Sequence, residues 1–162
     1  MFREMRRKKQ LLPEEEAIAI LKEGTSGVLA LSGDDGYPYA VPISYVYEGG
    51  RLWFHCAKSG HKLDAIRRES KASFCVIAQD KVVPEEYTTY FRSVIAFGTI
   101  RVLEGEEMRP AIERLALKYS PLESEESRRE EIEKTWKALC ILELEVEHLT
   151  GKEAIELTRQ RG

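Results

Sequence analysis

The strand-like stretches of this chain follow one another in runs, and this order limits the folds open to it. The first strands are expected at residues 27–32, 37–47 and 51–57, joined by Gly33-Asp-Asp-Gly36 and Glu48-Gly49-Gly50. Glycine and aspartate at such positions favour tight hairpin turns, so we expect an antiparallel meander. A doubly wound sheet needs strict alternation of strands and helices, which is not the order here.

The rest of the chain continues this mixed order. Further strands are expected at 72–78, 87–103 and 139–147, and helices at 12–23, 61–69, 106–119 and 130–138, with polar connections at 79–86 and 121–127. Together these elements predict a single domain over residues 1–162 with an α+β fold: a six-stranded, mostly antiparallel, barrel-like sheet with flanking helices.

Single residues refine this expectation. Pro42 cannot donate a hydrogen bond to a strand ladder, so it indicates an edge, a bulge or a kink. Gly98 indicates a bulge or a close approach of two backbones. In the last strand Leu142, Leu144 and Val146 alternate with Glu143, Glu145 and Glu147, which predicts one buried and one solvated face.

Composition excludes several function classes. The net charge of −3 argues against a nucleic-acid partner, and no apolar run reaches the ~20 residues that a membrane helix needs. The three cysteines, Cys56, Cys75 and Cys140, lie in apolar strand-like runs, as buried free thiols of a reducing cytoplasm do. Residues 1–10 are basic and are expected to form a flexible, solvated arm.

Residues 51–66 read as a strand, a short loop and the start of a helix. A helix N-terminus offers unpaired N–H groups and the positive end of the helix dipole. Gly60 lets the backbone approach an anion closely, Ser59 adds a hydroxyl, and Lys62 adds an ammonium group. This set suits a phosphate, although an ordinary strand-to-helix connection with a surface lysine has the same local pattern.

The sequence gives little support for a metal site, a glycine-rich nucleotide site or a catalytic nucleophile. The histidines His55, His61 and His148 lack metal-ligand spacing, so no metal site is expected. Nucleotide-binding glycine motifs and a nucleophile elbow are absent from the sequence. Two segments remain as candidates for binding: Pro42–Tyr45, whose backbone could meet the polar edge of a flat heterocycle, and Tyr90–Ser93. Each is also compatible with ordinary strand packing.

Several motifs, taken in order, resemble the nitroimidazole-resistance family of flavin-binding proteins, within the pyridoxamine 5′-phosphate oxidase-like superfamily. The resemblance runs from about Arg6 to Lys152 and rests on Val41-Pro-Ile-Ser-Tyr45, Leu52-Trp-Phe-His-Cys-Ala57, Gly60-His-Lys-Leu-Asp64, Tyr90-Phe-Arg-Ser-Val-Ile-Ala-Phe-Gly98 and Leu149-Thr-Gly-Lys152. The arginine-rich set with which the true oxidase holds its phosphorylated vitamin substrate is missing, so that substrate is not expected.

The resemblance implies a split β-barrel that binds FMN at a homodimer interface. Lys62 would contact the FMN phosphate, and the ring would lie along one strand. The implied cofactor-binding residues are Pro42, Ile43, Ser44, Tyr45, His55, Cys56, Ala57, Lys58, Ser59, Gly60, His61 and Lys62, with Tyr90, Arg92 and Ser93 completing the site from the partner.

The implied function is an FMN-dependent oxidoreductase of the nitroreductase kind. It would pass electrons from a reduced donor through FMN to a small, flat acceptor, with His55 as a catalytic proton donor. Two alternatives stay open: a flavin sensor or storage module without turnover, and a dimeric interaction protein with an empty pocket.

Overall fold

The computed structural model describes residues 1–161 and contains one open sheet of seven strands, in the order β2-β1-β5-β6-β7-β4-β3. All pairings between neighbouring strands are antiparallel. The strands are β1 (Ser26–Ser32), β2 (Pro38–Ser44), β3 (Val46–Glu48), β4 (Arg51–Cys56), β5 (Lys71–Val83), β6 (Thr88–Val102) and β7 (Cys140–Glu153). The α+β class with an antiparallel sheet is confirmed; six strands closed into a barrel is wrong.

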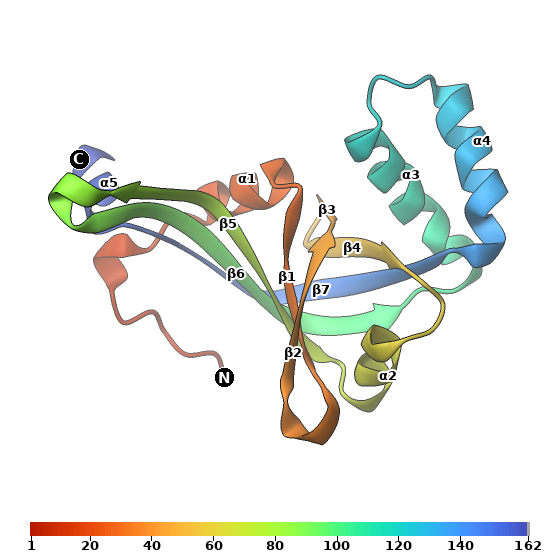
Figure 1. Ribbon diagram of the computed structural model, residues 1–162, viewed down its shortest axis with the longest axis horizontal. Coiled ribbons are helices and arrows are strands. Elements are labelled where there is room, and N and C mark those ends of the chain that lie inside the picture. The colour runs from red at the N-terminus through yellow and green to blue at the C-terminus, as the bar shows by residue number, and fades with distance from the viewer. Residues whose placement is uncertain (162) are drawn as a thin grey trace.

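The helices lie around this strongly twisted sheet (Figure 1). They are α1 (Glu14–Glu23), α2 (His61–Arg68), α3 (Met108–Tyr119), α4 (Glu125–Thr135) and α5 (Ile155–Arg161). Figure 1 shows α3 and α4 standing together above one end of β4 and β7, while α1 and α5 lie toward the opposite end. None of the helices within residues 1–161 has both the length and the apolar character needed to cross a membrane.

A break at Tyr45 accounts for the seventh strand. The strand expected at residues 37–47 breaks there into β2 and β3. The Tyr45 side chain is fully buried, and its hydroxyl donates to the Leu21 carbonyl oxygen at 2.7 Å. The Tyr45 backbone N–H donates to Tyr119 Oη at 2.9 Å instead of to a neighbouring strand, so the ladder stops here and the chain passes from one sheet edge to the other. β2 and β3 therefore occupy opposite edges. The expected three-strand meander is wrong as one continuous unit, although both of its hairpins form, as β1–β2 and β3–β4.

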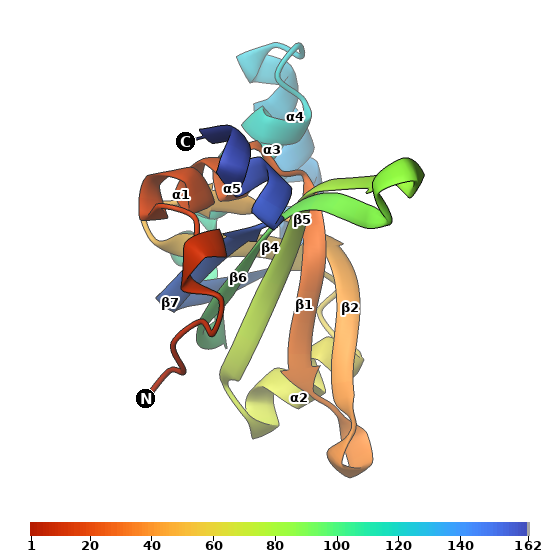
Figure 2. The same ribbon diagram turned by 90° about the vertical axis from the view of Figure 1, so that its left-hand side faces the viewer.

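Several strand and helix boundaries differ from those expected, because polar residues continue the element. The polar loop expected at 79–86 is mostly strand, since β5 runs to Val83 past a bulge and pairs with β6. This hairpin projects from the body of the molecule (Figure 2), so its residues need not be apolar. β7 likewise runs to Glu153 and includes Thr150–Lys152. Helix α4 begins at Glu125 because the Ser124 hydroxyl caps it, accepting from the Ser127 N–H at 3.0 Å.

The main core lies inside the curl of the sheet. Large, fully buried side chains there include Tyr45, Phe54 and Phe74, and their rings meet edge-on at centroid distances of 4.8 and 5.1 Å. Helices α1 and α2 close this core with apolar faces that include Leu21 and Leu63. Burial of these faces supplies the main driving force for docking both helices.

A second apolar cluster covers the opposite face of β3, β4 and β7. It joins Val46, Trp53 and Ile141 to the α3 residues Met108, Ala111 and Leu115. Glu143 lies on the same face of β7 as Ile141 and is buried, and its side chain pairs with Arg51 and Arg101 at 3.2 and 2.9 Å. The prediction of a solvated face on β7 is thus wrong at Glu143, whereas Glu145 and Glu147 are exposed as expected.

Gly98 marks a close approach, as predicted. The β6–β7 register shifts between Phe97 and Gly98, and a Cβ atom at Gly98 would lie 1.9 Å from the Glu145 carbonyl oxygen. The bulge lets β6 bend from the projecting hairpin into the body of the sheet.

Candidate functional site

The loop between β4 and α2 has the geometry of an anion site. Gly60 precedes α2 with φ of 131°, a conformation that favours glycine, and a Cβ atom there would meet nothing within 4 Å. No side chain among residues 1–161 caps the first turn of α2. Lys58 and Ser59 are exposed beside it, and Lys62 is half-buried. The unpaired backbone N–H groups at the start of α2 are therefore openly accessible, and Lys62 belongs to the same first turn.

His61 is held at the edge of this loop. Its ring stacks on Tyr39 of β2 with centroids 3.9 Å apart, and its Nε2 lies 3.7 Å from the Asp34 carboxylate. Asp34 also pairs with Arg68 at 2.7 Å, and this hydrogen bond from Arg68 lowers the Asp34 pKa. The β1–β2 turn and α2 are therefore linked, which orders the start of α2 relative to β2.

Cys56 lies at the end of β4, opposite Cys140 of β7. Burial raises the Cys56 pKa to about 12, with a further contribution from the Cys140 thiol; the nearby Lys62 acts in the opposite direction. The thiol is therefore protonated at neutral pH and is a poor nucleophile. All three cysteines are free.

Strand β2 is a sheet edge, as Pro42 predicts. Gly33 N–H donates to the Tyr37 carbonyl oxygen, so in this antiparallel ladder the backbone groups of alternate residues, including Pro42 and Ser44, point away from β1. Pro42 offers only a carbonyl oxygen there, whereas Ser44 offers both an N–H and a carbonyl oxygen. The edge thus presents a short acceptor–donor pattern to a ligand. Ile43 is half-buried between them.

The end of α3 fixes the backbone where β2 ends. Tyr119 Oη accepts the Tyr45 N–H at 2.9 Å and lies within hydrogen-bond distance of the Thr25 and Tyr45 carbonyl oxygens. Lys118 lies over the Tyr45 ring, 4.2 Å from its centroid, and its Nζ donates to the Gly24 and Tyr45 carbonyl oxygens. Burial raises the pKa values of both tyrosines and lowers that of Lys118.

We expect Tyr119→Phe to destabilise the protein by about 1–3 kcal/mol, because the Tyr45 N–H loses its partner in a partly buried position. Urea unfolding measures this change. Tyr37→Phe, at a tyrosine that is 75% exposed, is the matched control and should leave stability within about 0.5 kcal/mol. Equal effects of the two substitutions would contradict the role of Tyr119.

A cleft joins the strands to the helical pair α3–α4. Its volume is about 630 Å³, and Ser44 and His55 line it from the strand side. Apolar residues of its wall are Ile112, Leu115, Ala116 and Ile132; polar ones are Tyr119, Ser120, Glu123, Ser127, Arg128, Glu130, Glu131, Lys134 and Thr135. The exposed His55 side chain therefore has access to a ligand-sized space.

The structure separates the predicted site residues into two groups. Residues of the β2 edge and of the β4–α2 loop lie at neighbouring positions: the stacking of His61 on Tyr39 joins these elements. His55 and Ser44 share the cleft, Ala57 and Pro42 are exposed, and the Tyr45 side chain is in the core. Tyr90, Arg92 and Ser93 lie on the part of β6 that pairs with the outer half of β5.

Within one chain, Tyr90 and Arg92 have other partners. Tyr90 Oη donates to Glu86 at 2.6 Å. Arg92 Nε contacts Glu153 Oε2 at 3.1 Å, and Glu153 is 2% exposed. Ser93 pairs with Ile77 across the ladder and so shares its sheet face. Among Tyr90, Arg92 and Ser93, it is Ser93 whose side chain lies on the outward face of the sheet, next to that of Ile95.

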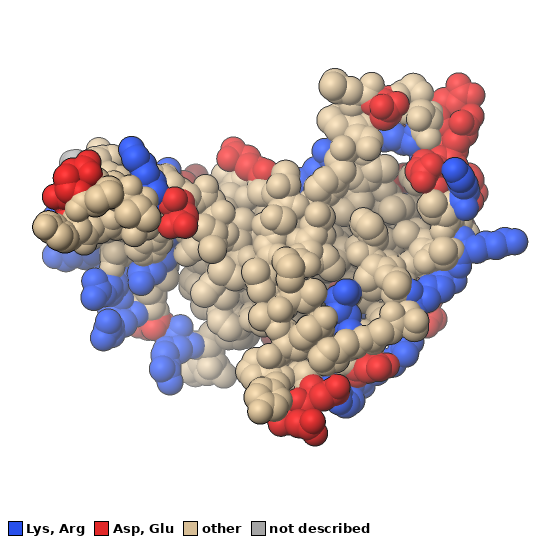
Figure 3. Space-filling model, in the orientation of Figure 1, with Lys and Arg blue, Asp and Glu red and all other residues tan. Residues whose placement is uncertain are grey.

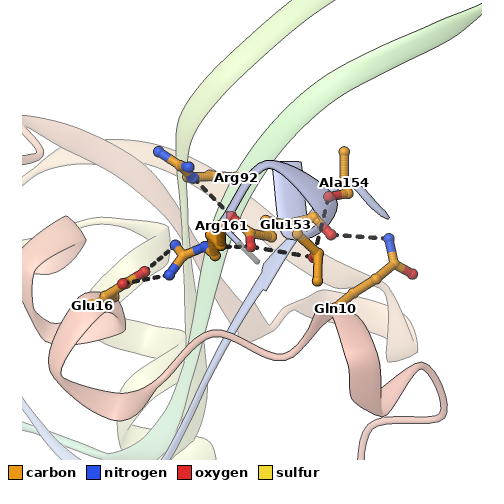
Figure 4. A network of polar contacts seen from close by, with 7 residues as sticks. Gln10, Glu16, Arg92, Glu153, Ala154 and Arg161 are labelled. Carbon is orange, nitrogen blue, oxygen red and sulfur yellow. Dashed lines mark hydrogen bonds and ion pairs between the residues drawn. The ribbon is translucent and has the colours of Figure 1, made fainter. Parts of the chain in front are cut away.

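Glu153 is the centre of a polar network that sequence reasoning missed (Figure 4). Its carboxylate also contacts Arg161 Nε at 2.6 Å and Thr158 Oγ1 at 3.2 Å, and its carbonyl oxygen accepts from Gln10 Nε2 at 2.9 Å. Arg161 binds Glu16 of α1 as well, which lowers the Glu16 pKa and raises that of Arg161. The network ties β6, β7, α1, α5 and the N-terminal segment together.

The N-terminal segment is partly structured. Gln10 is buried, and Phe2 stacks on His148 with ring centroids 4.7 Å apart. The flexibility expected for residues 1–10 stays a prediction. Within residues 1–161, no group of three or more histidine, cysteine or acidic side chains is placed to hold a metal ion.

The chain matches a known protein family along most of its length. The family described as pyridoxamine 5′-phosphate oxidase matches residues 13–153. Among curated proteins, none matches this chain.

Solved structures share the fold at low sequence identity. A conserved hypothetical protein from Mycobacterium tuberculosis has a TM-score of 0.79 at 17% identity, with 93% of this chain and 90% of that chain covered. A candidate 5-nitroimidazole antibiotic resistance protein from Bacteroides thetaiotaomicron has a TM-score of 0.71 at 20% identity, covering 88% and 86%. An FAD-binding protein from Mesorhizobium loti has a TM-score of 0.62 at 19% identity, covering 90% and 97%.

Proposed function

The chain belongs to the pyridoxamine 5′-phosphate oxidase family, and from this premise we propose that it is a flavin-binding oxidoreductase that uses FMN. The observation that carries the proposal is the open, uncapped N-terminus of α2, with Gly60 and Lys62, beside the free edge of β2. The family resemblance predicted from the motifs is confirmed, and solved relatives include a protein described as FAD-binding.

The residues present fit the phosphate end of such a cofactor. Lys62 supplies a cation, Ser59 a hydroxyl, and the first turn of α2 its N–H groups. Gly60 leaves the approach open, since a Cβ atom at that position would be surrounded by free space. FMN ends in a single phosphate, which matches one helix N-terminus with one adjacent lysine better than a diphosphate does.

The ring end of the cofactor fits the β2 edge. The outward Pro42 carbonyl oxygen and the Ser44 N–H form a pattern that complements the polar edge of a flavin ring. Ser44 in turn lines the cleft that contains His55. The hydrogen bonds from Tyr119 and Lys118 to the Tyr45 backbone hold this edge in place.

When bound, a flavin would supply two-electron redox chemistry between a reduced donor, such as a nicotinamide dinucleotide, and an acceptor. Reduction of a nitro group to a nitroso group consumes two electrons and two protons and releases one water. His55 is exposed in the cleft and can donate a proton to the acceptor there. The chain contributes binding, orientation and this proton.

Turnover tests the oxidoreductase assignment directly. Purified protein loaded with FMN is mixed with NADH or NADPH under anaerobic conditions, and a nitroaromatic compound is then added. We expect loss and recovery of the flavin absorbance, with one nicotinamide oxidised per nitro group reduced to nitroso. Binding of FMN without either step would instead favour the alternative, a flavin sensor or storage module.

The proposal includes a homodimer with the flavin site at the interface. Val28, Cys75 and Ile95 are register neighbours on β1, β5 and β6, and Ile77 extends the same face. Val28 and Ile95 are 39% exposed and Ile77 is 66% exposed. A contiguous apolar sheet face of this kind is typical of a protein interface. Ser93 pairs with Ile77, so a partner covering this face would also bring its own Ser93 into the interface.

Ile77→Asp tests this arrangement. We expect light scattering to give the mass of two 18.6 kDa chains for the unmodified protein and of one chain for the variant, because a carboxylate would be desolvated at the interface. Flavin affinity should fall together with the dimer. Leu122→Asp, at a residue that is 98% exposed outside the sheet, is the control. A single-chain mass for the unmodified protein would refute the dimer.

A further inference from the structure

In the helical pair α3–α4, it is α3 that packs on the sheet. Helix α3 packs on the second apolar cluster through Met108, Ala111 and Leu115. Helix α4 has one buried residue, Ile132, among its 11 residues, and is attached mainly to α3. Arg109 of α3 makes that attachment, contacting Glu133 at 3.0 Å and lying 4.5 Å from the Trp136 ring centroid. A helix so polar contributes little to the core.

What α4 does form is one wall of the cleft of about 630 Å³ that contains His55. Ligand pockets have volumes of about 300–1,000 Å³ and combine apolar walls with a few polar groups. Here the apolar wall comes from Leu115, Ala116 and Ile132, and the strand side carries Ser44 and His55. Ser44, at the end of the β2 edge, lines the cleft, whereas Gly60 and Lys62 do not. The cleft therefore adjoins the ring end of the proposed cofactor site rather than its phosphate end.

The charge of the wall restricts the ligand. Glu123, Glu130 and Glu131 line the cleft, and none of them has an ion-pair partner within the part of the chain that the structure describes. The cations are Arg128 and Lys134, and the Arg128 guanidinium already donates to the Ser120 and Glu123 carbonyl oxygens. Three carboxylates against two cations leave the lining with a net negative charge, which attracts a cation and repels an anion; acidic side chains gather over α4 in Figure 3.

We infer that the α3–α4 cleft is the pocket for the electron acceptor, and that it selects small, flat, cationic or uncharged molecules against anionic ones. This inference rests on the proposed function, because the acceptor must reach a flavin at the Ser44 edge. It gives the helical pair a role in substrate selection: the carboxylates of α4 set the charge preference, and Ala116 leaves room for an aromatic ring.

The experiment compares three acceptors of similar size: 4-nitrobenzylamine, which is a cation at neutral pH, 4-nitrobenzyl alcohol and 4-nitrobenzoate. Calorimetric titration into the FMN-loaded protein measures their binding, and turnover measures kcat/KM. We expect the cation to bind at least about tenfold more tightly than the anion, the direction that facing carboxylates impose.

Two variants test the wall. The Glu130→Gln, Glu131→Gln double variant alters exposed side chains and should reduce the cation-to-anion ratio about fivefold, whereas Glu126→Gln on the same helix should leave it unchanged. Ala116→Trp should fill the cleft and weaken the binding of all three acceptors. Leu117→Trp is its control, because Leu117 is the next residue, is 44% exposed and does not line the cleft.

The outcomes separate this inference from the proposed function. Normal FMN binding with an unchanged charge preference in the double variant, or with unchanged acceptor affinity in Ala116→Trp, would overturn the cleft assignment alone. Failure of the unmodified protein to bind FMN in the same titrations would overturn the proposed function instead. Loss of selectivity in the double variant with intact FMN affinity supports both.

Discussion

Lys62→Ala is expected to weaken FMN binding by about 10- to 150-fold, which corresponds to the roughly 1.5–3 kcal/mol of a hydrogen bond to a charged group. Lys62 is the half-buried cation next to Gly60 at the start of α2. Its removal leaves the N–H groups of the first turn but takes away the charge that compensates a phosphate. Fluorescence titration with FMN measures the dissociation constant.

Arg67→Ala is the matched control for Lys62. Arg67 lies in the same helix and carries the same charge, but it is exposed near the C-terminal end of α2. Its loss should change FMN affinity less than twofold. A Lys62→Ala protein that folds normally and keeps its FMN affinity would remove the phosphate assignment. Riboflavin, which has no phosphate, should bind both variants equally.

Glu153→Ala is expected to destabilise the protein by about 3–5 kcal/mol, the usual effect of removing one partner from a buried ion pair. The Glu153 carboxylate is nearly inaccessible and is shared by Arg92 and Arg161, at 3.1 and 2.6 Å. Without it, two guanidinium groups face each other beside the core. In a domain of about 160 residues such a loss would lower Tm by roughly 10 °C.

Glu145→Ala provides the comparison for Glu153. Glu145 lies on the same strand but is exposed, so its removal should change stability by no more than about 0.5 kcal/mol. Urea unfolding of both variants gives the difference. A loss below about 1 kcal/mol for Glu153→Ala would show that the network is not a structural anchor. Glu153→Gln, which keeps most of the shape, should lie between the two.

Short sequence patterns predicted the turns and helix ends that glycine and proline residues determine. The Gly33–Gly36 turn forms the β1–β2 hairpin, with Asp35 and Gly36 at positive φ. Helix α1 begins after Pro13 and ends at Gly24, and α2 follows Gly60. These boundaries follow from residues whose backbone preferences are strong. The ordered motifs also identified the family, because spacing over most of the chain is more specific than any one motif.

Features that depend on distant contacts were not predictable. The break at Tyr45 has no local signal, since Leu21 and Tyr119, the partners of its side chain and its backbone, are far along the chain. Glu143 and Glu153 look like surface residues, yet contacts with side chains of other elements bury both. The cleft likewise needs α3 and α4 to be placed over His55, which no local pattern specifies. Such burial is decided by packing rather than by sequence period.

The visible absorption spectrum of the purified protein tests the central claim most directly. A two-band flavin spectrum, with FMN identified by chromatography after heat release, is the result that the β4–α2 phosphate site and the free β2 edge lead us to expect. A colourless protein that also fails to bind added FMN would contradict the flavin site and the redox function together.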